Sequence, residues 1–194
     1  MNISVSQKAA LPSMASRPFS ELPTERFRLQ MRPHALAIYK RIFPGSRIED
    51  LREQGVRVHV LDVEFGIDAL WRFPDGQWIT IQEKYRRNEH LRKYGDFTQE
   101  WKNAYGTQYE SDGEWFKLAA QLYFYGWANE TATGFAKWIL LDVLRYKVIV
   151  QHAGGLNRIG KFQQNRQHGS AAFYAIPLVT LENAIILSSD RMPG

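Results

Sequence analysis

Residues 66–84 of the chain have the sequence GIDALWRFPDGQWITIQEK, in which two apolar runs flank a Pro-Asp-Gly turn. Proline presets φ at the start of such a turn, and glycine tolerates the left-handed conformation that closes a short hairpin. The runs at 67–73 and 78–85 are rich in β-branched and aromatic residues, which favour strands. The sequence therefore predicts a β-hairpin with its turn at residues 74–76.

Polar side chains collect at the open end of this hairpin. Because side chains alternate along a strand, Gln82 and Lys84 are expected on one face and Glu83 on the other, while the turn brings Asp68 alongside. A carboxylate that holds a hard cation such as Mg²⁺, an amide oxygen and a lysine that orients water suit hydrolysis of a phosphodiester. The competing interpretation is an ordinary cross-strand ion pair between Asp68 and Lys84.

These motifs resemble the PD-(D/E)xK nuclease superfamily, which has the restriction-endonuclease-like fold, and especially its small phage and prokaryotic members. The resemblance runs from about Val56 to Tyr125 and implies an α/β domain whose central mixed β-sheet is flanked by helices. It also implies Mg²⁺-dependent cleavage of nucleic acid, with Mn²⁺ as a substitute ion and DNA favoured over RNA. Asp68 matches the first acid of the family motif, and Lys84 matches its lysine. Gln82 stands where the family has Asp or Glu.

A neutral amide at position 82 donates no negative charge, which weakens metal binding. Glu100 is a candidate to replace the missing acid, because the strand expected over residues 96–104 would lie beside the hairpin, as in family members whose second acid comes from that strand. Glu83 is adjacent in sequence but points to the opposite face unless a bulge turns it. The metal ligands implied by the resemblance are Asp68, Gln82, Glu83 and Glu100, and the catalytic residues are Asp68, Gln82, Lys84 and Glu100.

The charge of the chain favours nucleic acid as a partner. Its 194 residues include 25 Lys and Arg against 20 Asp and Glu, which gives a net charge of +5 and a pI near 9.5. Such an excess attracts polyanions, although a basic surface that serves solubility alone is the alternative. The phosphate contacts expected from the basic segments are Arg86, Arg87, His90, Arg92, Lys93, Arg158, Lys161 and Arg166.

Other chemistries are excluded or disfavoured. The absence of cysteine excludes disulfides, thiolate zinc sites, iron–sulfur clusters and a cysteine nucleophile. The five histidines form no HExxH motif, and no glycine-rich phosphate loop is present. Without a long apolar run or a signal-peptide pattern, the expectation is a cytoplasmic protein that does not contact membranes.

The remaining elements follow from periodicity and capping signals. Residues 1–25, with three prolines, are expected to form a flexible arm, and residues 26–194 a single domain.

Helices are predicted over 26–43 with a break near Pro33, over 47–54 after a Ser46 cap, over 114–120 as one or two turns, and over 143–152 after an Asp142 cap. Strands are predicted over 56–62, 96–104, 122–127, 137–141 and 171–176. A polar segment at 157–169 and an amphipathic piece at 178–187 complete the chain. The aromatic run at 123–125 is interpreted as core.

Two interpretations compete with a nuclease. One is a nucleic-acid-binding protein on the same scaffold that has lost part of its metal site, and the other is a basic assembly or partner-binding protein. Cleavage abolished by EDTA distinguishes the nuclease from the binding protein, and strong salt-dependent DNA binding disfavours the assembly protein. Because cutting both strands of a duplex usually takes two active sites, a homodimer is compatible with the nuclease.

Overall fold

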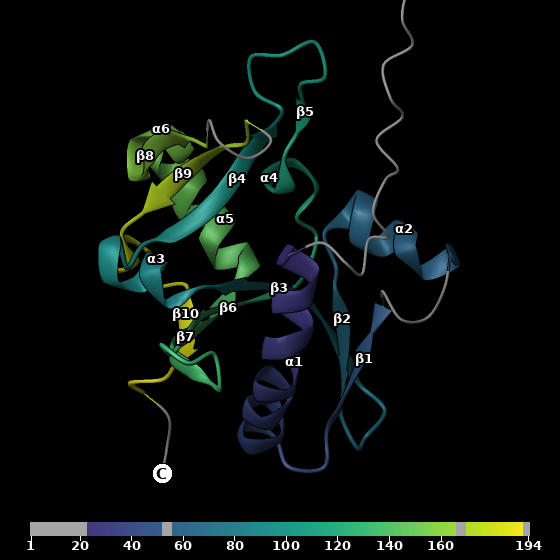
Figure 1. Cartoon of the computed structure of the whole chain (residues 1–194). Coiled ribbons are helices and arrows are strands. Elements are labelled where there is room, and N and C mark those ends of the chain that lie inside the picture. Colours follow the sequence, from purple (N-terminus) through teal and green to yellow (C-terminus); the bar gives the residue numbers. More distant parts are fainter. Residues whose placement is uncertain (1–22, 52–55, 166–169, 192–194) are drawn as a thin grey trace, which may run out of the picture.

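The computed structural model of the chain describes residues 23–51, 56–165 and 170–191, and for 56–59 the backbone alone. Two β-sheets with helices packed on them make up the molecule (Figure 1). This confirms an α/β protein with a mixed sheet flanked by helices. Helix α1 begins at Pro23, so the arm expected over residues 1–25 lies almost wholly outside the described residues.

The larger sheet has six strands in the order β1-β2-β3-β6-β7-β10. Strands β3 and β6 run parallel at its centre, and all other neighbours run antiparallel. The strands are β1 (Arg47–Asp50), β2 (Ala69–Arg72), β3 (Trp78–Arg86), β6 (Leu122–Ala128), β7 (Phe135–Asp142) and β10 (Ile185–Ser188).

Strands β2 and β3 form the predicted hairpin. The backbone N–H of Phe73 donates to the carbonyl of Gln77 at 2.8 Å, and that of Gly76 donates to the carbonyl of Phe73 at 3.0 Å. Gly76 has a φ of +86°, the left-handed conformation that favours glycine. The Pro-Asp-Gly turn is therefore confirmed.

The smaller sheet is antiparallel and shares a core with the larger one. Its strands lie in the order β5 (Ser111–Asp112), β4 (Phe97–Asn103), β9 (Ala172–Ile176) and β8 (Lys161–Gln164). The Phe97 ring lies 5.3, 5.0 and 5.4 Å from the rings of Tyr123, Tyr125 and Tyr146. Because the residues of the run at 123–125 are fully buried, its interpretation as core is confirmed.

Helices cover both faces of the central strands. Helix α1 crosses in front of the larger sheet in Figure 1, with Tyr39 fully buried against Trp71 and Phe124. Helix α5 contributes Tyr146 and Val150 to the core on the opposite face. The helices are α1 (Pro23–Ile42), α2 (Val56–Phe65), α3 (Asn88–Lys93), α4 (Glu114–Lys117), α5 (Val143–Ala153), α6 (Leu156–Ile159) and the 3₁₀ helix η3 (Leu178–Leu181).

The strand predicted over residues 56–62 is wrong, because this segment forms helix α2. β-Branched residues cost a helix only a few tenths of a kcal/mol each, so the alternating valines do not prevent it. Gly66, with a φ of +55°, ends the helix: its N–H donates to the carbonyl of Asp62 at 3.1 Å, and the N–H of Ile67 donates to that of Leu61 at 3.0 Å. The glycine that precedes Asp68 is thus also a helix stop.

Near the N-terminus, the helix predicted over 26–43 is confirmed as α1 but without the break near Pro33, and the helix predicted over 47–54 is wrong over residues 47–50. Residues 47–50 form strand β1, which pairs with β2, and the Ser46 hydroxyl accepts a hydrogen bond from Trp71 Nε1 at 2.7 Å instead of capping a helix. Helix α1 continues through Pro33, which lies on its exposed side, while Arg32 and Ala35 are buried against the sheet. Packing of the flanking residues holds the helix together where proline would otherwise break it.

Two further segments differ from the prediction because their pairing is non-local. The polar segment at 157–169 contains α6 and strand β8, which pairs with β9. The amphipathic piece at 178–187 divides into η3 and the start of β10, which pairs with β7. Local composition carries little information about such partners.

The predicted cap of helix α5 is confirmed and generates a test. Asp142 Oδ1 accepts a hydrogen bond from the Arg145 backbone N–H at 2.9 Å. We expect Asp142→Ala to lower the free energy of unfolding by about 1 kcal/mol, and Asp142→Asn, which keeps an acceptor, to lower it by much less. Urea unfolding of both variants measures the difference, and equal losses would contradict the capping role.

Candidate active site

The hairpin places Asp68 beside β3, as the sequence predicts. Ala69 pairs with Ile81, so the residue before β2 lies opposite Gln82 in the antiparallel register. The Asp68 side chain is buried, and its Oδ2 accepts a hydrogen bond from the backbone N–H of Glu83 at 2.7 Å. This bond fixes the carboxylate against the central strand.

The Gln82 side chain has a buried oxygen without a protein partner. Gln82 is 7% exposed, and its Oε1 accepts no hydrogen bond within the described part of the chain. Gly66 borders the same space, since a Cβ there would lie 3.6 Å from this oxygen. Leaving a buried acceptor unsatisfied costs roughly 1–3 kcal/mol, which makes Oε1 a candidate ligand for a cation.

Lys84 is paired with an acid that the sequence interpretation missed. Its Nζ lies 2.7 Å from Glu114 Oε2, and both side chains are largely buried. The other oxygen of Glu114 accepts a hydrogen bond from the Tyr123 hydroxyl, and Tyr123 is the β6 residue that pairs with Gln82. Glu114 comes from the first turn of α4, thirty positions after Lys84, and no sequence motif marks it.

Glu83 lies on the opposite face of β3, as side-chain alternation predicts. Its carboxylate receives the Arg32 guanidinium and accepts hydrogen bonds from the hydroxyls of Tyr39 and Tyr85, each at 2.8 Å. Burial raises the pKa of both tyrosines well above their ordinary value, so both hydroxyls stay protonated and donate. These contacts favour Glu83 as an anchor for helix α1 over Glu83 as a metal ligand.

The anchor continues as a chain of ion pairs along helix α1. Arg32 Nη2 lies 3.5 Å from Asp50 Oδ2, and Arg28 Nη1 lies 2.9 Å from the same oxygen. Arg28 also pairs with Glu25 at 2.7 Å. A cavity of about 230 Å³ lies between Glu25 and Arg28 of the helix and the residues 83–85 of β3.

Glu100 does not lie where the sequence interpretation put it. Its strand, β4, belongs to the smaller sheet, and the neighbours of β3 are β2 and β6. The expectation that strand 96–104 lies directly beside β3 is therefore wrong, because the parallel strand β6 occupies that place. Glu100 is half-buried opposite Phe173, and no ion pair of its carboxylate occurs among the described residues.

The basic residues after Lys84 divide into an internal and an external group. Arg86 lies on the Gln82–Lys84 face and donates to the hydroxyls of Tyr125, at 2.9 Å, and Thr98. Arg87, Arg92 and Lys93 are exposed. Of the other expected phosphate contacts, Arg158 and Lys161 are exposed near the smaller sheet, and Arg166 lies outside the described residues.

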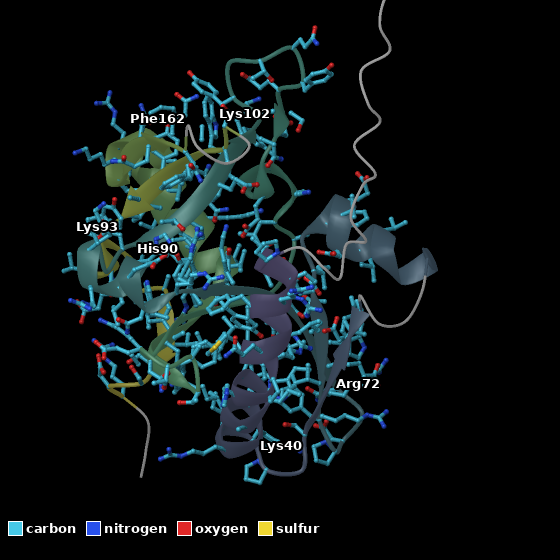
Figure 2. All side chains as sticks on the ribbon, viewed as in Figure 1. Lys40, Arg72, His90, Lys93, Lys102 and Phe162 are labelled. Carbon is cyan, nitrogen blue, oxygen red and sulfur yellow. The ribbon has the colours of Figure 1, made fainter. Side chains whose placement is uncertain are left out.

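His90 and Lys93 project together from α3 at the left edge of the molecule (Figure 2). Partial burial, together with the nearby Arg86 charge, lowers the pKa of His90 below its ordinary value of 6.5. The imidazole is therefore mainly neutral at pH 7. It adds a positive charge to this surface only in more acidic solution.

The side chains at this site fit a hard cation through few protein ligands. No group of three or more His, Cys, Asp or Glu side chains suited to a metal ion occurs within residues 23–51, 56–165 and 170–191. Asp68 and Gln82 offer carboxylate and amide oxygens, which Mg²⁺ accepts together with water. A cation here would keep much of its hydration shell.

Comparisons with protein-family models, with curated proteins and with solved structures find no match to this chain. In the described part of the chain, no helix has the length and apolar character needed to cross a membrane. A proposed function therefore rests on the residues of this chain.

The two roles considered for Glu83 make different predictions. We expect Glu83→Gln to lower the free energy of unfolding by about 3 kcal/mol, because it leaves the buried Arg32 short of a counter-charge. Urea unfolding in EDTA measures this loss without any contribution from a divalent ion. Glu100→Gln is the control, with an expected change within about 0.5 kcal/mol. Unchanged stability of Glu83→Gln combined with weaker Mn²⁺ binding would make Glu83 a ligand instead.

Proposed function

We propose that this protein is a metal-dependent nuclease of the restriction-endonuclease-like fold that hydrolyses phosphodiester bonds, with DNA favoured over RNA. The observation that carries the proposal is the buried Gln82 Oε1, which has no hydrogen-bond partner among the described residues, on the strand of Lys84 and opposite Asp68. An ordinary cross-strand ion pair explains Lys84 less well, because its Nζ lies 2.7 Å from Glu114 Oε2, an acid from another element.

Each residue has a role that its position supports. Asp68, held by the Glu83 backbone, and Gln82 would bind Mg²⁺, or Mn²⁺ in its place. A bound ion would lower the pKa of a coordinated water and offset charge on the phosphate. The Lys84 ammonium orients the attacking water and stabilises negative charge that develops on the phosphate oxygens.

Exposed cations near the end of β3 support nucleic acid as the substrate. Arg87 immediately follows the strand, and Arg92 and Lys93 lie on the exposed side of α3. Because the chain carries a net charge of +5, its field favours a polyanion generally. Cleavage of both strands of a duplex would involve two copies of the chain.

A non-catalytic nucleic-acid-binding protein is the second candidate. It is favoured by the neutral side chain at position 82 and by the small number of carboxylates on the Gln82–Lys84 face. This candidate uses the same cations to bind phosphates but cleaves nothing.

Cleavage assays test the nuclease directly. We expect Asp68→Asn and Lys84→Ala each to lower kcat by roughly 100-fold or more, because one loses an anionic ligand and the other the group that orients water. The assay uses labelled single-stranded, duplex and branched DNA and RNA with Mg²⁺, Mn²⁺ or EDTA. Asp75→Asn in the exposed turn of the same hairpin is the matched control. A wild-type protein that binds neither ion and cuts none of these substrates would leave the binding protein as the function.

The salt dependence of binding tests the proposed phosphate contacts. Each lost contact to duplex DNA should flatten the slope of log K against log salt by about 0.9. We expect the triple variant Arg87→Gln, Arg92→Gln, Lys93→Gln to lose up to three such increments. The control is Lys40→Gln with Arg41→Gln at the far end of α1, where Figure 2 shows Lys40 distant from His90 and Lys93. Equal slopes in the triple variant and wild type would move the contact surface elsewhere.

A further inference from the structure

We infer that Glu114 is the second acid of the site. It is a positioning residue: its carboxylate holds Lys84 and brings to the site the negative charge that the neutral Gln82 does not provide. This inference rests on the proposed nuclease function. It replaces Glu100, which the sequence suggested for the same role.

The Glu114 carboxylate contacts two side chains of the central strands. Glu114 holds Lys84 Nζ at 2.7 Å with one oxygen and accepts from the Tyr123 hydroxyl with the other. Because Tyr123 pairs with Gln82 across β3 and β6, the Glu114 carboxylate spans the face on which Gln82 and Lys84 lie. The carboxylate thus approaches this face from α4, outside the hairpin.

Helix α4 is held in place by contacts that do not involve Lys84. Gly113, directly before the helix, packs so closely on β4 that a Cβ would lie 2.7 Å from the carbonyl carbon of Trp101. Its N–H also donates to the Trp101 carbonyl at 2.9 Å. The backbone thus presents Glu114 to Lys84 in a preorganised position, which reduces the entropy lost when the pair forms.

The Glu114 carboxylate balances the charge of a largely buried ammonium. The side chains of Lys84 and Glu114 are 18% and 11% exposed, so the ammonium needs a counter-charge close by. Without Glu114, the uncompensated positive charge of Lys84 would repel a cation held by Asp68 and Gln82. Glu114 therefore both orients Lys84 and permits a cation to bind beside it.

Tyr123 completes the arrangement. Burial and the adjacent Glu114 charge raise the pKa of Tyr123 well above its ordinary value, so its hydroxyl remains a donor to the carboxylate. The carboxylate is held from two sides, and its position does not depend on the lysine alone.

Two variants, one that removes the carboxylate at position 114 and one that also places a carboxylate at position 82, test the inference. We expect Glu114→Gln to lower kcat by roughly 100-fold with a change in KM of less than about threefold, and to raise the Kd for Mn²⁺, measured by calorimetry, by about 10-fold. The double variant Gln82→Glu, Glu114→Gln returns a carboxylate to the face of Lys84. It should recover kcat to within about 10-fold of wild type and the Mn²⁺ Kd to within about twofold. The matched control is Asp112→Asn, an exposed carboxylate two residues before Glu114.

The outcomes separate this inference from the nuclease proposal. Active wild-type protein whose kcat and Mn²⁺ affinity are unchanged by Glu114→Gln overturns the role of Glu114 and leaves the nuclease standing. A folded double variant that recovers neither quantity, with thermal unfolding as the check of folding, also overturns it. Wild-type protein that cuts nothing overturns the nuclease, and the Mn²⁺ affinities of the two variants then decide the role of Glu114.

Discussion

Glu83 of the central strand β3 connects the Asp68 segment with helix α1. Its backbone N–H fixes the Asp68 carboxylate at the start of β2, and its side chain receives Arg32 from helix α1. Because a buried carboxylate and a buried guanidinium are each costly without the other, α1 cannot leave this face without a large penalty. The position of the candidate first acid therefore depends on a strand that the helix holds in place.

Side-chain alternation along β3 places the contacts that hold α1 on one face of the strand and the candidate site residues on the other. Glu83 and Tyr85 face α1, where tyrosine hydroxyls and arginines satisfy every carboxylate oxygen named above. Gln82 and Lys84 face the other way, where Gln82 Oε1 has no hydrogen-bond partner among the described residues and the Lys84 ammonium pairs with an acid from α4. A strand can serve both purposes because its two faces share a backbone but have separate surroundings.

Turn residues, side-chain alternation and helix capping were enough to predict the features that depend on residues close together in the sequence. The hairpin, the placement of Asp68 beside Lys84's strand and the Asp142 cap follow from turn residues, alternation and capping, and the structure has each of them. Strand β1 and helix α2 were mispredicted, because pairing with β2 and the Gly66 stop outweigh weak propensities. Glu114 had no local signal at all, since its relation to Lys84 depends on how α4 packs on β4.

The neutral residue at position 82 follows from the electrostatics of this face. Glu114 already brings one carboxylate to the space between Tyr123 and Lys84, and Asp68, directly before β2, lies opposite Gln82. A glutamate at position 82 would add a third carboxylate to largely buried surroundings that hold two cations, Lys84 and Arg86, and like charges in such surroundings repel strongly. Gln82 and Glu114 are therefore one solution to the charge balance, and a glutamate at 82 with a neutral residue at 114 is the other. The Gln82 amide adds no charge to this face, where the carboxylate that pairs with Lys84 comes from α4.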